Sequence, residues 1–217
     1  MSNILRSKLV VIGDWATGKS AIIQQFINSG TAFPKNYSMT LGGEVLTRLV
    51  NIPDSTDGVE LVMIDCSGRA VYSDILSRAW DGAALILAVF DVTREESLVA
   101  AKTWVEQVKQ SSEAKTFPGV LLANKTDLTE RRVVSPKIGL DMATQLQLQY
   151  FECSAKDHTG VEEPFFYLAN EWHKLHAEQA SDMANIVLLA GIWLALVSQH
   201  RYGYHCLVNR VLLPLLS

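Results

Sequence analysis

The sequence is 217 residues long, which is enough for one α/β domain of ordinary size with a hydrophobic core. Its formal net charge of −4 argues against the clustered basic surface that nucleic-acid binding requires, so no nucleic-acid partner is expected. The cysteines Cys66, Cys153 and Cys206 are far apart and form no CxxC pair, which argues against a metal framework and a disulfide scaffold.

Apolar runs and helical stretches alternate along the chain. The patterns that predict strands lie at residues 8–13, 44–51, 58–65, 83–91, 119–124 and 149–153. The patterns that predict helices lie at about 20–30, 95–110, 138–146 and 161–176. This alternation predicts a doubly wound α/β fold, with a mostly parallel six-stranded sheet and helices on both faces. Ligands of such sheets bind beyond the carboxyl ends of the strands.

The composition changes at Met183. From there on the chain contains no acidic residue, and only Arg201 and Arg210 carry a fixed charge. We therefore expect a domain over residues 1–180 and a hydrophobic tail over residues 183–217. The apolar start of the tail would span about 22 Å as a helix, short of the roughly 30 Å hydrocarbon core of a bilayer. A strained membrane anchor, a helix packed on the domain or on a partner, and a segment foreign to the domain remain open.

A phosphate-binding loop is expected at residues 13–20. They read GDWATGKS and match G-x4-G-K-[ST] between a predicted strand and a predicted helix. The glycines let backbone N–H groups point at phosphate oxygens, and the helix adds the positive end of its dipole. Lys19 is placed to reach the β- and γ-phosphates, and the Ser20 hydroxyl to ligate Mg²⁺. The residues expected at the phosphates are Gly13, Asp14, Trp15, Ala16, Thr17, Gly18, Lys19, Ser20 and Ala21.

The motif NKTD, which ends at Asp127, follows a predicted strand. The carboxylate of Asp127 can accept hydrogen bonds from guanine N1–H and from the exocyclic amine. Adenine has neither donor and would leave this carboxylate unpaired, so the motif favours GTP over ATP. The aliphatic stem of Lys125 can cover the base, and Asn124 can tie neighbouring loops together.

The motif CSAK at residues 153–156 follows the last predicted strand. The backbone N–H of Ala155 can donate to guanine O6, and Ser154 and Lys156 belong to the same expected guanine site. The alternative interpretation makes Ser154 the N-cap of a helix. In order after a phosphate-binding loop, the two later motifs favour a guanine nucleotide.

With these motifs in this order, residues 8 to about 178 resemble the Ras-like small GTPases, Rab branch. The resemblance implies GTP or GDP with Mg²⁺ as cofactors. It implies that Phe33 packs against the guanine and that Thr40, in YSMTLGG, ligates Mg²⁺ and senses the γ-phosphate. In DCSGRA, Asp65 would hold Mg²⁺ through water, and the Gly68 N–H would contact the γ-phosphate.

Four stretches are similar to Rab-like subunits of the intraflagellar transport complex, namely FPKNYSMTLGGEV, IPDSTDGVEL, LANKTDL and EEPFFYLAN. This similarity implies a GTP/GDP-binding switch subunit of complex B in the cilium or flagellum and at the basal body, with a cytoplasmic pool. Its implied partners are intraflagellar transport protein 25 and other complex B subunits. No lipid anchor is expected, because the sequence ends PLLS and Cys206 is too far from the end for prenylation.

Arg69 departs from the family pattern, because it stands where the family has the glutamine that orients the attacking water. A guanidinium only donates hydrogen bonds, so it cannot replace that glutamine. Arg69 would act as a poor internal arginine finger or simply lie exposed in its loop. We assign no catalytic residue.

Trp15 is the second departure, at a position of the phosphate-binding loop that the family keeps small. Its indole would crowd an external arginine finger or fold outward over the loop. Because the cradle is built from main-chain N–H groups and Lys19, we expect nucleotide binding with slow GTP hydrolysis. The competing functions are a structural subunit with a fixed nucleotide and a vesicle-trafficking Rab GTPase.

Overall fold

The structure is a computed structural model. It describes residues 3–31, 33, 34, 36, 38–111 and 118–199, and for residues 181–185 and 188–199 it describes the backbone alone. The chain divides into two compact units, Met1–Lys174 and Leu175–Ser217. The first unit contains every residue predicted to bind nucleotide or metal.

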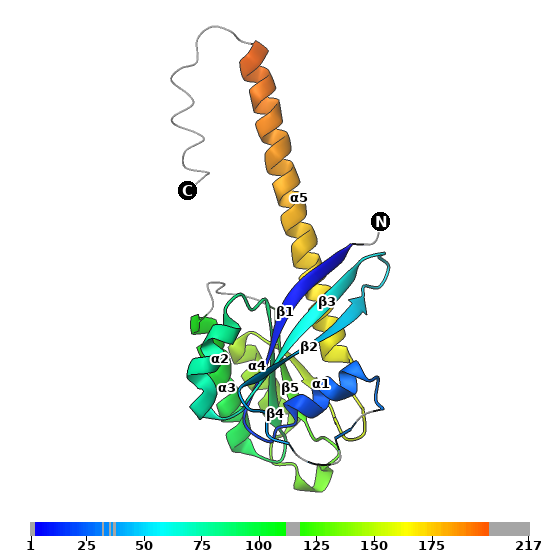
Figure 1. Ribbon diagram of the computed structural model, residues 1–217, viewed down its shortest axis with the longest axis vertical. Coiled ribbons are helices and arrows are strands. Elements are labelled where there is room, and N and C mark those ends of the chain that lie inside the picture. Colours follow the sequence, from blue (N-terminus) through cyan, green and yellow to red (C-terminus); the bar gives the residue numbers. More distant parts are fainter. Residues whose placement is uncertain (1–2, 32, 35, 37, 112–117, 200–217) are drawn as a thin grey trace. The chain divides into compact units, whose positions relative to one another are not determined.

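A central sheet organises the first unit, and six strands belong to it within the described residues (Figure 1). Its order is β2–β3–β1–β4–β5–β6; β2 runs antiparallel to β3, and the other neighbouring strands are parallel. The strands are β1 (Ile4–Ile12), β2 (Gly43–Asn51), β3 (Gly58–Cys66), β4 (Leu85–Asp91), β5 (Gly119–Asn124) and β6 (Gln149–Glu152). The predicted doubly wound fold with a mostly parallel sheet is therefore confirmed.

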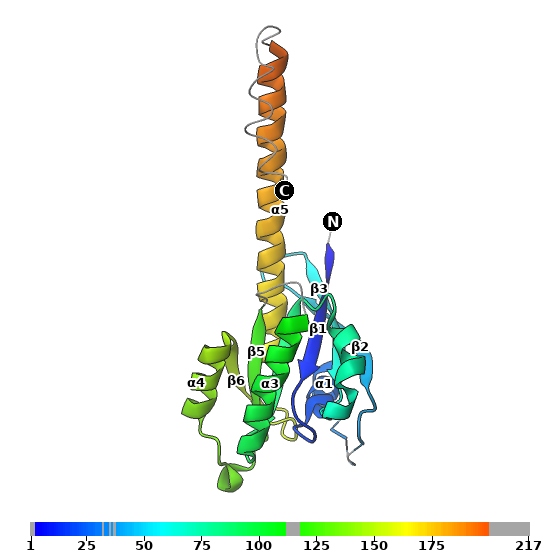
Figure 2. The ribbon, with the colours of Figure 1, turned by 90° about the vertical axis from the view of Figure 1, so that its left-hand side faces the viewer.

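Helices cover both faces of the sheet. They are α1 (Lys19–Ile27), α2 (Ser73–Trp80), α3 (Glu95–Ser111), α4 (Pro136–Leu146) and α5 (Glu163–Gln199), with 3₁₀ turns η1 (Ala70–Tyr72) and η2 (Thr129–Arg131). Buried side chains of α1 and the beginning of α5 pack on one face, and those of α2, α3 and α4 pack on the other. Figure 2 looks onto this second layer, where α3 and α4 lie side by side.

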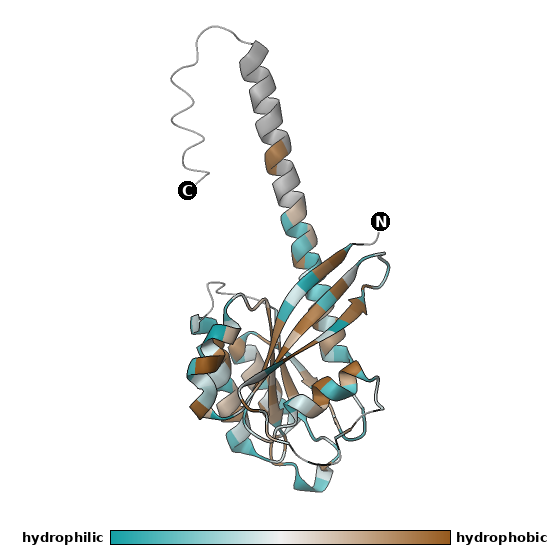
Figure 3. Cartoon of the chain, in the orientation of Figure 1, coloured by the Kyte–Doolittle hydropathy of each residue, from teal (hydrophilic) through white to brown (hydrophobic). Residues whose placement is uncertain are grey.

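The core is apolar on both sides of the sheet, and the central strands are largely brown in Figure 3. β4 and β5 are buried along their whole length, as the continuous run 83–91 predicted for a strand covered on both faces. On one face, the ring of Phe26 in α1 stacks on that of Phe165 in α5, with centroids 3.9 Å apart. On the other, Trp80 of α2 meets Trp104 of α3 edge to face, with centroids 5.9 Å apart.

Two helices differ from the sequence-based expectation. α2 was not predicted, and Leu76 and Trp80 bury it against the core. The last helix, expected to end near residue 176, continues to Gln199 across the break in composition. No helix within the described part of the chain is both long enough and apolar enough to cross a membrane. The rest of the predicted tail, Cys206 included, lies outside the described residues.

Candidate nucleotide-binding site

The predicted motifs meet at one edge of the sheet because each follows a strand. The phosphate-binding loop follows β1, Gly68 follows β3, NKTD begins with the last residue of β5, and CSAK follows β6. These strands are mutually parallel, so their carboxyl ends lie at the same edge. Binding residues that are far apart in the sequence therefore become neighbours.

The backbone of the phosphate-binding loop turns sharply at Gly13. This residue has a φ of +139°, and a Cβ added to it would lie 2.1 Å from the carbonyl oxygen of Val89 in β4. Ala16 also has a positive φ, of +55°, and Gly18 precedes the first residue of α1. The loop therefore curls around the N-terminal end of α1, the geometry that suits an anion.

Lys19 lies buried inside this curl. Its Nζ donates hydrogen bonds to the carbonyl oxygens of Gly13, at 3.0 Å, and Asp14, at 2.8 Å. Burial lowers the pKa of Lys19 to about 8, although the negative charge of Asp65 acts in the opposite direction. A phosphate at the mouth of the loop would favour the charged ammonium, because an anion stabilises the protonated form.

The three predicted metal-binding residues come together from three segments. The hydroxyl of Ser20 in α1 donates to Asp65 Oδ2 of β3 at 2.5 Å, and Thr40 Oγ1 lies 3.1 Å from Ser20 Oγ and 3.4 Å from Asp65 Oδ2. Asp65 Oδ1 is buried and has no hydrogen-bond partner among the described residues. Burial raises the pKa of Asp65. Two hydroxyls and a carboxylate with an unused oxygen are the hard donors that Mg²⁺ prefers, so these residues fit the predicted ion.

Asn124 connects the phosphate-binding loop to the loop after β6. Its Nδ2 donates to the Thr17 carbonyl oxygen at 2.8 Å, and its Oδ1 accepts the Ala155 N–H at 3.1 Å. Asn124 therefore ties neighbouring loops together, as its position predicted. The Ala155 N–H, predicted to donate to guanine O6, already has an acceptor, so a contact with the base would share this donor.

Asp127 is held by the CSAK loop. Its Oδ1 accepts the Ser154 hydroxyl at 2.8 Å, and the Lys156 Nζ lies 3.7 Å from Oδ2. The side chain of Asp127 is only 7% exposed. Ser154 accepts the Asp157 N–H within a turn, and the next helix begins at Glu163, so the alternative role as a helix N-cap is wrong.

Lys125 reaches from the NKTD motif toward the phosphate-binding loop. Its Nζ donates to the Ala16 carbonyl oxygen at 2.8 Å and pairs with Asp91 Oδ2 at 2.6 Å. Burial pushes the pKa of Asp91 upward, but hydrogen bonds from Lys125 and Thr93 outweigh it and hold that pKa below its usual value. Both contacts fix the Nζ end of Lys125 against the phosphate-binding loop and β4.

A cavity of about 970 Å³ lies between these loops, a size that suits a small-molecule ligand. Its lining includes most of the phosphate-binding loop, Thr40, Gly68 and Arg69. Of the predicted guanine-binding residues it includes Phe33, which is 45% exposed, and Lys125. Its lining does not include the remaining ones, Asn124, Asp127, Ser154, Ala155 and Lys156.

Sequence reasoning missed three supporting residues. Asp91 anchors Lys125, Gln25 of α1 donates from Nε2 to the Ala155 carbonyl oxygen at 2.7 Å, and Arg94 pairs with Asp14. Asp91 had a visible signal, since it is the acidic end of an otherwise apolar run. Gln25 and Arg94 had none, because only the folded chain shows their partners.

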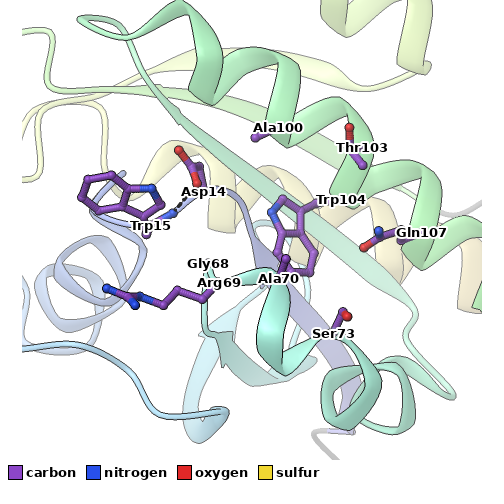
Figure 4. A pocket seen from close by; sticks show the side chains of 10 residues that line it. All are labelled: Asp14, Trp15, Gly68, Arg69, Ala70, Ser73, Ala100, Thr103, Trp104 and Gln107. Carbon is purple, nitrogen blue, oxygen red and sulfur yellow. Dashed lines mark hydrogen bonds between the residues drawn. The ribbon is translucent and has the colours of Figure 1, made fainter.

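The two departures from the family pattern lie close to each other. Trp15 and Arg69 both border a second cavity, of about 650 Å³, between the phosphate-binding loop and helices α2 and α3 (Figure 4). Arg69 is exposed, and Trp15 is 51% exposed. Gly68 lies so close to the phosphate-binding loop that a Cβ added to it would lie 2.3 Å from the backbone nitrogen of Trp15. Gly68 is therefore packed against the same loop that would hold the phosphates.

A phosphate-binding loop opening a helix, oxygen donors for Mg²⁺ and an NKxD motif on this sheet define a P-loop small GTPase fold. The chain belongs to the Ras family, whose model matches residues 8–174. It is 37% identical to the intraflagellar transport protein 27 homolog of Bos taurus, over 81% of this chain and 94% of that protein. It is 36% identical to intraflagellar transport protein 27 of Chlamydomonas reinhardtii, over 82% and 89% of the two chains.

Rab proteins are also similar. Ras-related protein Rab-28 of Caenorhabditis elegans is 32% identical over 85% of this chain and 74% of that protein. The resemblance to the Ras-like GTPases and to the Rab-like intraflagellar transport subunits is thereby confirmed.

Proposed function

We propose that the protein is a GTP/GDP-binding switch subunit of the intraflagellar transport complex B, with slow GTP hydrolysis. The observation that carries the nucleotide part is the meeting of Ser20, Thr40 and Asp65 beside the phosphate-binding loop. The names of the relatives support the transport part. On the same grounds we propose the cilium or flagellum, the basal body and a cytoplasmic pool as its locations, and intraflagellar transport protein 25 with other complex B subunits as partners.

Each residue has a definite task in this proposal. Lys19 and the loop N–H groups hold the β- and γ-phosphates, and Asp127 accepts the guanine donors. Ser20, Thr40 and Asp65 hold Mg²⁺, which neutralises charge on the phosphates when it is bound. Thr40 lies in a segment without helix or strand, so its contact with Ser20 and Asp65 can report which nucleotide is present.

The first prediction concerns nucleotide content. The purified full-length chain is expected to carry GDP or GTP, released by denaturation and identified by chromatography, and EDTA should speed its release by removing Mg²⁺. A chain without guanine nucleotide and without affinity for GDP would contradict the proposal. Slow release that EDTA does not change would favour a structural subunit with a fixed nucleotide, because a switch has to exchange.

The second prediction concerns Arg69. Replacing it by glutamine is expected to raise the single-turnover rate of GTP hydrolysis about tenfold, since a glutamine amide both donates to and accepts from the attacking water. Arg69→Ala removes the guanidinium without supplying the amide, so it separates the effect of losing the arginine from the effect of gaining the glutamine. Arg131→Gln, at an exposed arginine of η2, serves as the control. A lower rate for Arg69→Gln than for the natural chain would show that Arg69 assists the reaction as an internal finger.

A further inference from the structure

Arg94, in the loop between β4 and α3, contacts two consecutive residues of the phosphate-binding loop. Its guanidinium forms an ion pair with the Asp14 carboxylate and donates to the Trp15 carbonyl oxygen at 3.2 Å. Its Cζ also lies over the Trp15 ring, 4.8 Å from the ring centroid. A planar guanidinium can make these contacts together because its donors lie in the plane while its face stacks on the indole.

Gly68 also lies against the backbone of the same two residues. A Cβ added to Gly68 would lie 2.3 Å from the backbone nitrogen of Trp15 and 2.4 Å from the carbonyl carbon of Asp14. The Trp15 N–H donates to Asp14 Oδ1 at 2.8 Å, as the dashed line in Figure 4 shows. Arg94 and Gly68 therefore both contact Asp14 and Trp15, and of the two Arg94 also contacts the indole.

The position of this indole affects the room for a ligand. Trp15 borders both cavities, the one beside α3 and the one that contains Lys19, Ser20 and Thr40. An indole that turned toward Lys19 and Ser20 would occupy the end of the cavity where the terminal phosphate belongs. The contact with Arg94 opposes this turn, because the indole would lose its cationic neighbour.

We propose that Arg94 is a positioning residue that holds the Trp15 indole beside the phosphate end of the cavity, so that a nucleoside triphosphate can enter. This inference rests on the proposed nucleotide binding. A displaced indole would collide with the γ-phosphate, which GDP lacks. Arg94 should therefore favour the binding of a triphosphate over that of a diphosphate. A role in folding alone would change the affinities for both nucleotides alike.

The test is the ratio of two dissociation constants, for a non-hydrolysable GTP analogue and for GDP, measured on the full chain with Mg²⁺. Arg94→Ala is expected to weaken the analogue relative to GDP about fivefold, the scale set by a lost cation–π contact. Arg94→Lys keeps a positive charge beside Asp14 but has no planar group to stack on the indole, so it should weaken the analogue relative to GDP by a smaller factor. If Arg94→Ala fails to fold, Arg94→Lys serves in its place. Arg131→Ala is the matched control and should leave the ratio unchanged.

A Trp15→Gly background separates the indole from the charge of Asp14. Without the indole, Arg94→Ala is expected to leave the ratio unchanged, whereas repulsion by an unpaired Asp14 would change it in both backgrounds and overturn the inference. An unchanged ratio for both Arg94 variants in the natural background would also overturn it. Failure of the unsubstituted chain to bind either nucleotide would contradict the proposed function itself, so the two failures are distinguishable.

Discussion

Replacement of Asp127 by asparagine is expected to weaken GDP and GTP binding at least about a hundredfold, the scale seen when a buried polar site loses its matching group. The carboxylate offers two acceptors to the two guanine donors, N1–H and the exocyclic amine. An asparagine amide offers one acceptor and one donor, and its NH₂ would face the exocyclic amine of guanine. Because Asp127 is 7% exposed, water cannot relieve this mismatch.

The same substitution should create an affinity for xanthine nucleotides. Xanthine has a carbonyl where guanine has its amine, so it offers the donor and acceptor that an asparagine amide requires. The measurement is competition of GDP and xanthosine diphosphate for the natural chain and for Asp127→Asn. Asp157→Asn, at an exposed carboxylate directly after the CSAK motif, is the matched control and should keep the preference for GDP. Unchanged GDP affinity in Asp127→Asn would place the base elsewhere.

Replacement of Gly13 by alanine is expected to lower the free energy of unfolding by about 3 to 5 kcal/mol, combining a strained backbone with overpacking. The new Cβ would lie 2.1 Å from the Val89 carbonyl oxygen, in a fully buried part of β4. Neither neighbour can retreat, because β1 and β4 are hydrogen-bonded strands of the same sheet. Urea unfolding followed by far-UV circular dichroism, after EDTA has removed nucleotide, measures the change.

Gly82→Ala is the matched control for this substitution. Gly82 also has a positive φ, of +65°, but a Cβ there would meet nothing within 4 Å. Its replacement should therefore cost only the backbone term, roughly 1 to 2 kcal/mol. Equal losses for the two variants would mean that the close approach of Gly13 to β4 contributes nothing to stability.

Local patterns were sufficient for much of this protein. The apolar runs of β4 and β5 predicted strands covered on both faces, and both strands are buried along their whole length. The phosphate-binding loop and NKTD could be predicted because each consists of consecutive residues with a recognisable pattern, whereas Asp65 was assigned through the resemblance of DCSGRA to the family. Helix α2 was missed because it is short and its boundaries are weak, and the burial of Leu76 and Trp80 supplies its stability.

The residues that support the site could not be found in this way. Arg94 lies far along the chain from Asp14 and Trp15, and they meet because β1 and β4 are adjacent parallel strands whose loops leave the sheet at the same edge. The sequence alone therefore predicted which kinds of functional residue lie at this edge of the sheet. The tertiary structure decided which side chains face one another there, because strand order is set by long-range packing and not by neighbouring residues.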